Sequence, residues 1–85
     1  MADIADMSPE ERFQLLDQMA TDYFGTARWK AAFARKYGLR SSTPVDWMNG
    51  RQATPDWTFA AMRDAMDLKK LDAVRRAIEA ASGSN

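Results

Sequence analysis

The chain has 85 residues and a mass of 9.6 kDa, so it has room for one hydrophobic core and one domain. Hydrophobic residues make up 46% of it and aromatic residues 11%, which predicts a globular fold rather than a disordered chain. It has no cysteine and no histidine, which excludes disulfide bonds, thiolate zinc sites, cysteine nucleophiles and catalysis by an imidazole base.

A net charge of zero conceals an uneven distribution of the twelve basic and twelve acidic residues. Residues 1–27 hold six acids and one base, a net charge of −5, and residues 52–85 hold five of each. Residues 28–51 hold one acid and six bases, a net charge of +5, and the bases are Arg28, Lys30, Arg35, Lys36, Arg40 and Arg51. Salt screens charges more than about 8–10 Å apart, so a local patch of this kind can bind a polyanion whatever the total charge. We expect these bases to form one continuous, outward-facing cationic ridge; the alternative is that they only keep a helix soluble.

The amino-terminal residues 1–6 are acidic and interrupted by charge, unlike a signal peptide, and no apolar run approaches the roughly 18 residues of a membrane span. We therefore expect a cytoplasmic protein. The chain also lacks a glycine-rich phosphate loop and an acidic calcium loop, and its serine clusters fall in predicted turns and in the tail. We expect no enzymatic activity, no metal and no cofactor.

Ser8-Pro9-Glu10-Glu11 predicts the start of the first helix. Ser8 is an N-cap, Pro9 suits the first helical position and Glu11 completes a capping box. The first-turn acids are explained by the helix dipole rather than by acid–base chemistry. A core-facing stripe at helical spacing follows, with Met19 beside it: Phe13, Leu16, Ala20, Tyr23 and Phe24. Gly25 is the expected end.

Two short helices are predicted next, joined by a polar turn that contains Gly38. The first begins at Thr26 and places the aromatic pair Trp29 and Phe33 in the core. The second is at most two turns long and ends at Asn49-Gly50. Its expected cap is Thr43, followed by Pro44 in the first helical position and Asp46 in the third.

The carboxyl-terminal part is predicted to form two further helices. Thr54-Pro55-Asp56 repeats the start signal, and the apolar residues after it are Trp57, Phe59, Met62 and Met66. A second stripe, Leu68, Leu71, Val74 and Ile78, is rotated from the first by roughly 130° around a straight helix. We therefore expect a break near residues 67–69 and a fifth helix to about Ala81, followed by a disordered tail over residues 82–85. The second stripe either packs on the protein's own core or forms a homodimer seam.

These elements together predict an all-α fold, a compact bundle of about five short helices in one domain over residues 1–81. Within it, Ala34 is small where two helices cross, and Gly38 supplies a positive φ for the turn. Leu39 fills the inner corner, and Trp47 with Met48 anchors the third helix in the core. Two short helices arranged in this way are typical of a helix-turn-helix.

The stretch Gly25–Met62 resembles the lambda-repressor/Cro type of helix-turn-helix DNA-binding proteins. The matching residues are 29–39 (WKAAFARKYGL), 47–51 (WMNGR) and 54–57 (TPDW), which cover a little under half of the chain. The family usually has a β-branched apolar residue where this chain has Pro44, and we expect the proline to delay the start of the third helix. The resemblance implies a small transcriptional regulator that binds specific sequences of double-stranded DNA, with its recognition helix near residues 41–49 in the major groove.

The resemblance also assigns roles to individual residues. Lys30 would contact a phosphate, Ser41 and Ser42 would face base edges with Arg40 and Thr43 beside them, and Asn49, Arg51 and Arg28 would hold the DNA backbone. Asp46 has two interpretations, a cap bonded to Thr43 and, less commonly, an acceptor for the amino group of a cytosine.

The alternative function is a protein-interaction module on the same scaffold, an adaptor or an antagonist of the transcription machinery. Its binding surface would be the acidic first helix, with Asp17, Asp22 and the capping acids. The two functions differ in salt dependence, because only contacts to phosphates weaken steeply as salt rises.

Overall fold

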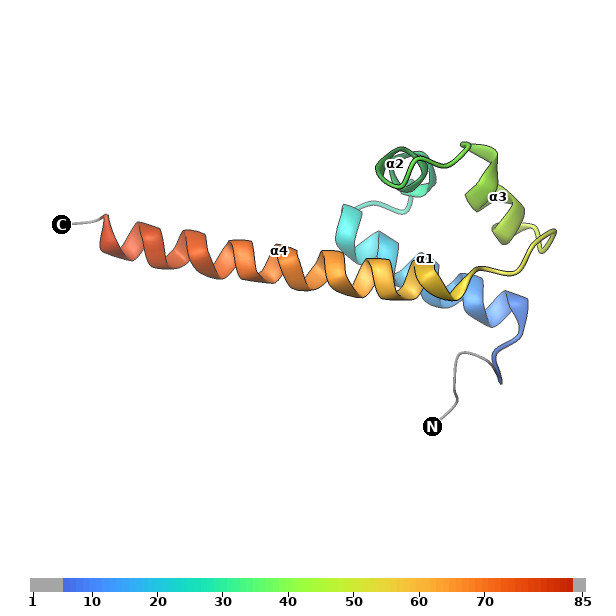
Figure 1. Ribbon diagram of the computed structural model, residues 1–85, viewed down its shortest axis with the longest axis horizontal. Helices are drawn as coiled ribbons and strands as arrows, with labels where there is room; N and C mark the ends of the chain where they lie inside the picture. Colours follow the sequence, from blue (N-terminus) through green and yellow to red (C-terminus); the bar gives the residue numbers. More distant parts are fainter. Residues whose placement is uncertain (1–5, 84–85) are drawn as a thin grey trace.

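The computed structural model describes residues 6–83, and in them it forms four α-helices and no strand (Figure 1). The helices are α1 (Pro9–Phe24), α2 (Lys30–Lys36), α3 (Ser42–Met48) and α4 (Asp56–Ser82). The predicted all-α class is confirmed, but there are four helices instead of five. The amino-terminal residues 1–5, used above against a signal peptide, and residues 84–85 of the expected tail lie outside the described residues.

The molecule is elongated and not the compact bundle that we expected. Its Cα radius of gyration is 15.8 Å, whereas a compact chain of this length has a value of about 12 Å. Its extents are 56 × 32 × 19 Å, and Figure 1 shows why: α1, α2 and α3 gather around the first half of α4, and the second half projects alone.

The first helix begins and ends as the sequence predicts. The Ser8 hydroxyl accepts from the Glu11 backbone N–H at 3.2 Å, and the Ser8 backbone N–H donates to Glu11 Oε1 at 3.1 Å. This reciprocal pair is the predicted capping box. The hydrogen bond from the Ser8 backbone, with a second from its side chain, lowers the pKa of Glu11 below its ordinary value of 4.5.

The core joins all four helices, and its centre is aromatic. It contains Leu16, Ala20, Trp29, Phe33, Trp47, Phe59, Met62 and Ala65, none more than 8% exposed. The predicted pair of Trp29 and Phe33 is fully buried, with ring centroids 5.7 Å apart. Trp29 also stacks on Phe13 of α1, and its indole N–H donates to Asp17 Oδ1 at 2.7 Å. The Asp17 carboxylate is thus the acceptor for the one polar side-chain group of the buried tryptophan.

The two short helices differ from their predicted bounds by a few residues. The second helix does not begin at Thr26, because the Thr26 hydroxyl accepts from the Arg28 backbone N–H at 3.1 Å in a local turn, and α2 begins at Lys30. The third helix begins earlier than predicted, with Ser41 as its N-cap, so Thr43 is not a cap and Pro44 does not delay the start. Proline is accommodated there because the first-turn amides of a helix have no intrahelical acceptor.

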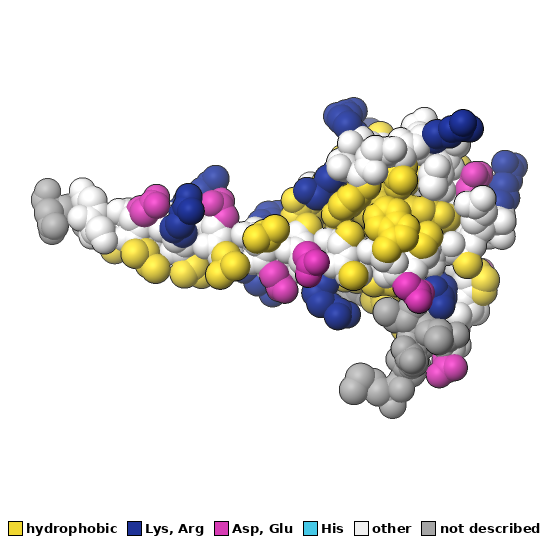
Figure 2. All heavy atoms as spheres, viewed as in Figure 1, with side chains coloured by type: hydrophobic (Ala, Val, Ile, Leu, Met, Phe, Trp, Pro, Cys, Tyr) yellow, Lys and Arg dark blue, Asp and Glu magenta, His cyan; other side chains and the backbone are white. Residues whose placement is uncertain are grey.

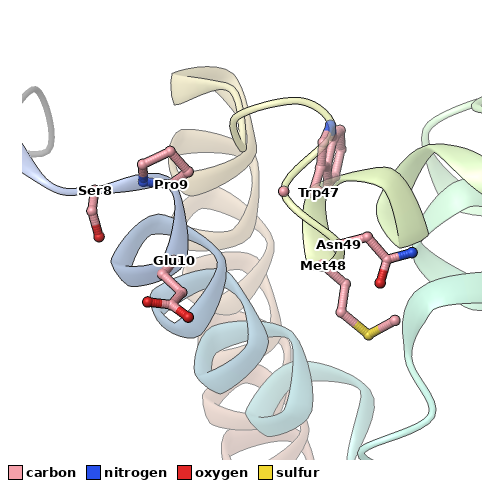
Figure 3. Close-up of a pocket in the computed structure, with 7 residues that line it drawn as sticks. Ser8, Pro9, Glu10, Trp47, Met48 and Asn49 are labelled. Carbon is pink, nitrogen blue, oxygen red and sulfur yellow. The ribbon is translucent and has the colours of Figure 1, made fainter.

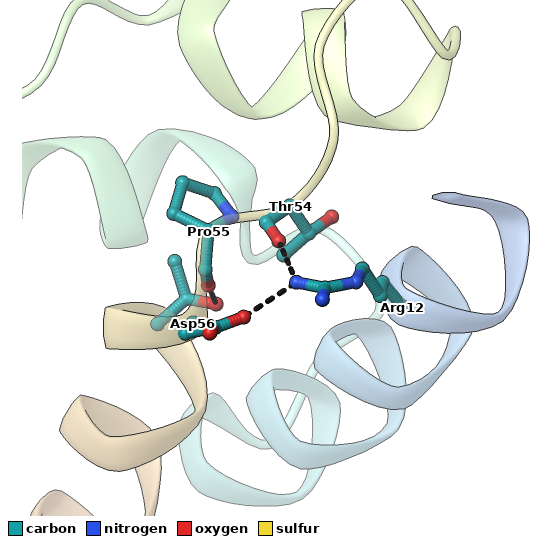
Figure 4. Close-up of polar contacts among 5 residues, drawn as sticks. Arg12, Thr54, Pro55 and Asp56 are labelled. Carbon is teal, nitrogen blue, oxygen red and sulfur yellow. Dashed lines mark hydrogen bonds and ion pairs between the residues drawn. The ribbon is translucent and has the colours of Figure 1, made fainter. Parts of the chain in front are cut away.

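Thr54 is likewise not the cap of α4, since Pro55 occupies that position without a side-chain cap. Instead, the backbone entering α4 is held by Arg12 of α1, as Figure 4 shows. Arg12 Nη1 donates to the Thr54 carbonyl oxygen at 3.1 Å and forms an ion pair with Asp56 at 2.5 Å. The contact joins the start of α1 to the start of α4, 44 residues along the chain.

The predicted break near residues 67–69 is absent, and α4 is one helix of 27 residues. Its sequence holds no glycine and no proline, so nothing in the backbone interrupts the hydrogen-bond ladder. The prediction of a break assumed that both apolar stripes must be buried against the same core. Of the first stripe, Phe59 and Met62 are buried and Met66 is half-buried, whereas every residue from Asp67 to Gly83 is exposed.

Candidate nucleic-acid interface

The two short helices α2 and α3 are held against each other by aromatic rings. Phe33 of α2 meets Trp47 of α3 edge to face, with ring centroids 5.9 Å apart, and both side chains are buried. Trp57 at the start of α4 contacts both rings, at 6.0 Å from Phe33 and 6.3 Å from Trp47. These contacts fix one face of α3, so its opposite face is presented to solvent on a rigid support.

The turn between the helices has the geometry that its residues predict. Gly38 has a φ of +67°, a backbone conformation that other residues rarely adopt, and the Leu39 backbone N–H then donates to the Ala34 carbonyl oxygen at 2.8 Å. Leu39 packs against the core as expected, and Ala34 is buried. The turn therefore sets the direction in which α3 leaves α2.

The residues expected to read bases lie at the start of α3. Arg40, Ser41 and Ser42 are exposed, and Thr43 is half-buried. The backbone N–H of Thr43 donates to the Arg40 carbonyl oxygen at 3.0 Å, which brings these residues into one tight turn. In the part of the chain that the structure describes, the side chains of Arg40, Ser41 and Ser42 have no protein hydrogen-bond partner.

Asn49 and Arg51 follow the other end of α3, a helix length of about 10 Å away. Asn49 lines a shallow hollow of about 350 Å³ between the end of α3 and the start of α1. Glu10 lines the other side of this hollow, and Figure 3 shows the Asn49 amide turned away from it. Met48, which we expected in the core, is 46% exposed here and lines the same hollow. Met48 therefore does not anchor α3; the buried residues of that helix are Pro44 and Trp47.

Asp46 is paired with Arg51 and does not cap the helix. Asp46 Oδ1 lies 3.7 Å from Arg51 Nη1, and both side chains remain partly in solvent. Such exposed pairs are weak, so Arg51 can exchange the carboxylate for a phosphate at little cost. The ion pair offsets the one acidic charge of the basic segment.

The basic residues of the segment do not form one ridge. Lys30 Nζ lies over the rings of Trp29 and Phe13, at 5.3 and 5.9 Å from their centroids. Lys36 is directed to Tyr23 of α1, where Lys69 of α4 also rests, at 5.5 and 5.2 Å from that ring. Three arginines, Arg28, Arg35 and Arg40, are exposed, and within the described residues none of them has a carboxylate at ion-pair distance. Figure 2 shows Lys and Arg side chains along the edge formed by α2 and α3.

Trp57, one of the apolar residues at the start of α4, lies at the surface. It is 41% exposed, although its ring contacts Phe33, Tyr37 and Trp47. Figure 2 shows a hydrophobic patch where α2 meets the start of α4. Burial raises the pKa of the Tyr37 phenol at its edge. Around the helix, Trp57 lies about 80° or more from each buried residue of α4, which places it at the side of the buried face.

Other classes of site find little support in the described residues. Within residues 6–83, no cluster of acidic side chains is suited to hold a metal ion. No helix in this part of the chain combines the length and the apolar character needed to cross a membrane. Comparison of the chain with models of protein families, with curated proteins and with solved structures yields no match.

Proposed function

We propose that the protein binds double-stranded DNA in a sequence-specific manner, as a small transcriptional regulator, through the solvent face of α3. The observation that carries this proposal is the start of α3, where Arg40, Ser41 and Ser42 are exposed while Trp47 holds the opposite face in the core. An arginine can bind guanine through two hydrogen bonds, and serine hydroxyls can donate to or accept from several bases. The α2–turn–α3 unit then acts as a helix-turn-helix.

The charge around α3 supports the same surface. Arg40 lies beside the proposed base-reading residues, Arg51 follows α3, and Arg28 precedes α2, so cations flank the helix pair at both ends. Two of the four acids of α1 are engaged within the protein, since Glu11 forms the capping box and Asp17 accepts from Trp29. Within residues 28–51 the one acid, Asp46, is paired with Arg51, so a polyanion meets little repulsion from this segment.

The alternative, a protein-interaction module on the acidic face of α1, loses support for the same reason. Asp17 is half-buried and hydrogen-bonded to the indole of Trp29, which leaves Asp22 as the exposed member of the proposed pair. The exposed acids that remain, Glu10 and Glu11 in the first turn and Asp22 in the last, lie at opposite ends of α1, and exposed charge pairs contribute little to binding.

The proposal is tested by selecting duplexes from a random pool with the full chain at two ionic strengths, and then measuring affinity against salt. We expect an enriched sequence, and a steep fall in affinity that corresponds to about four to six phosphate contacts. Arg40→Ala should weaken the free energy of binding to the enriched sequence by about 1–3 kcal/mol and relax the base preference at one position of that sequence. Arg28→Ala should weaken all duplexes alike and reduce the salt slope.

Arg76→Ala in the projecting part of α4 is the matched control, because it removes one exposed arginine far from α3 along the fold. It should leave affinity, sequence preference and salt slope close to those of the unaltered protein. Absence of binding at low salt, or equal losses on every sequence for Arg40→Ala and Arg28→Ala, would contradict the proposal and favour the protein-interaction alternative.

A further inference from the structure

The projecting half of α4 carries an apolar stripe that no other part of residues 6–83 covers. Leu68, Leu71, Val74 and Ile78 are 67%, 65%, 56% and 60% exposed, and they recur at helical spacing. Figure 2 shows hydrophobic side chains in a row along one edge of this segment. Asp67 and Arg75 border the stripe, and the other charged residues of the segment lie farther around the helix.

The exposed area of the molecule is larger than a monomer of this mass normally presents. The chain exposes 6132 Å², whereas a compact monomer of 9.6 kDa exposes about 5,100 Å². The difference is on the order of 1,000 Å² per chain, whereas a standard interface buries about 800 Å² on each partner. A lone helical segment of about four turns is also only marginally stable in water, because most helical stability in proteins comes from packing of the apolar face.

We propose that this surface binds a second copy of the chain, with the two α4 segments antiparallel and crossing near Val74. In this arrangement Leu71 lies opposite the partner's Ile78, and each stripe buries the other. The segment from Asp67 to Ser82 is about 24 Å long, and the rest of the protein lies before it along the helix. An antiparallel partner therefore overlaps the whole segment and places its own body beyond the tip of α4, without collision.

The charges beside the stripe favour this orientation. Asp72 and Arg75 lie on one flank of the stripe, and together with Leu68 and Leu71 they line a hollow of about 260 Å³ that can receive a partner side chain. Antiparallel helices bring like flanks together, so Asp72 faces the partner's Arg75 and the reverse pair forms by symmetry. A parallel dimer would instead place Lys70 beside the partner's Arg75, which repels it.

The existing ion pairs of these residues do not oppose the pairing. Asp72 pairs with Arg76 at 3.1 Å and Arg75 with Glu79 at 3.5 Å, both within α4 and both exposed. Exposed pairs of this spacing contribute little, so the side chains are available to share with a partner. The pairing is independent of DNA binding, because α3 and the projecting half of α4 are separate surfaces (Figure 1).

Sedimentation of the full chain at micromolar concentration tests the association. We expect dimers for the unaltered protein and for Ala80→Asp, which adds the same charge on the opposite side of α4. Val74→Asp should raise the dissociation constant at least about tenfold, because it places a carboxylate at the centre of the apolar seam. Circular dichroism checks that both variants keep their helices. A protein that stays monomeric at ~100 µM, far above typical Kd values of interfaces, or a Val74→Asp variant that still forms dimers as tightly, would overturn the proposal.

Cysteine cross-linking tests the orientation, because the chain has no cysteine of its own. Under oxidation, a mixture of Leu71→Cys and Ile78→Cys proteins should form a disulfide-linked heterodimer, whereas each variant alone should not. Cross-linking of Leu71→Cys with itself would show a parallel pair, and absence of any cross-link would show that these residues do not meet. Either result would refute the antiparallel arrangement.

Discussion

Two threonines at the start of α4 show how one hydrogen bond decides whether a buried hydroxyl stabilises or destabilises the folded protein. Thr54 and Thr58 are both buried, at 1% and 0% exposure. The Thr58 hydroxyl donates to the Pro55 carbonyl oxygen at 2.7 Å, but within the described residues the Thr54 hydroxyl has no partner. A buried polar group without a partner costs about 1–3 kcal/mol.

Thr54→Val should therefore raise the free energy of unfolding by about 1 kcal/mol, because valine has a similar shape and no polar group to satisfy. Thr58→Val is the matched control and should lower it by about the same amount, since it removes a donor that is in use. Urea unfolding of the two variants measures both changes. The same sign for both would show that hydrogen bonding does not distinguish these sites.

At the scale of single elements, α1 and α4 differ in how their starts are held. The start of α1 is closed by its own residues, through the capping box of Ser8 and Glu11. The start of α4 has no side-chain cap and depends on Arg12 from another helix. A local cap can be recognised in the sequence, whereas a contact across 42 residues requires the fold.

The capping box predicts a specific pH dependence. Because the pKa of Glu11 is lowered in the folded protein, its ionised form stabilises α1 above the ordinary value of 4.5, and this contribution is lost as the pH falls through the lowered pKa. The melting temperature of Glu11→Gln should therefore fall less than that of the unaltered protein between pH 7 and pH 3. Glu10→Gln, in the same turn, should lose as much melting temperature between pH 7 and pH 3 as the unaltered protein. The same pH dependence of melting temperature for both variants would argue that the capping box is not its origin.

The whole molecule consists of a packed part and a projecting helix, and the two should respond differently to substitution. Phe33 is fully buried and its ring contacts those of four other residues, namely Trp29, Tyr37, Trp47 and Trp57. Ile78 lies on the projecting half and is 60% exposed. Global stability therefore depends on the packed part.

Phe33→Ala should lower the free energy of unfolding by about 3–5 kcal/mol, a large share of the total for a domain of this size. Ile78→Ala should change it by less than about 0.5 kcal/mol when measured at a concentration low enough to keep the chain monomeric. Thermal and urea unfolding followed by circular dichroism give both values. A large loss for Ile78→Ala under these conditions would mean that the stripe is covered within one chain.

The sequence alone determined the features that depend on neighbouring residues: the helical class, the capping box of α1, the pair of Trp29 and Phe33, and the glycine turn at Gly38. These follow from backbone geometry and from a hydrophobic period of 3.6 residues. Tertiary structure decided which apolar residues are buried, because periodicity identifies a face of a helix but not what lies against it. For this reason the sequence placed Met48 in the core and broke α4 near residues 67–69. In the structure Met48 is 46% exposed, and the core covers only the first half of an unbroken α4. The directions of Lys30 and Lys36 were also decided by packing, since both rest on aromatic rings contributed in part by α1.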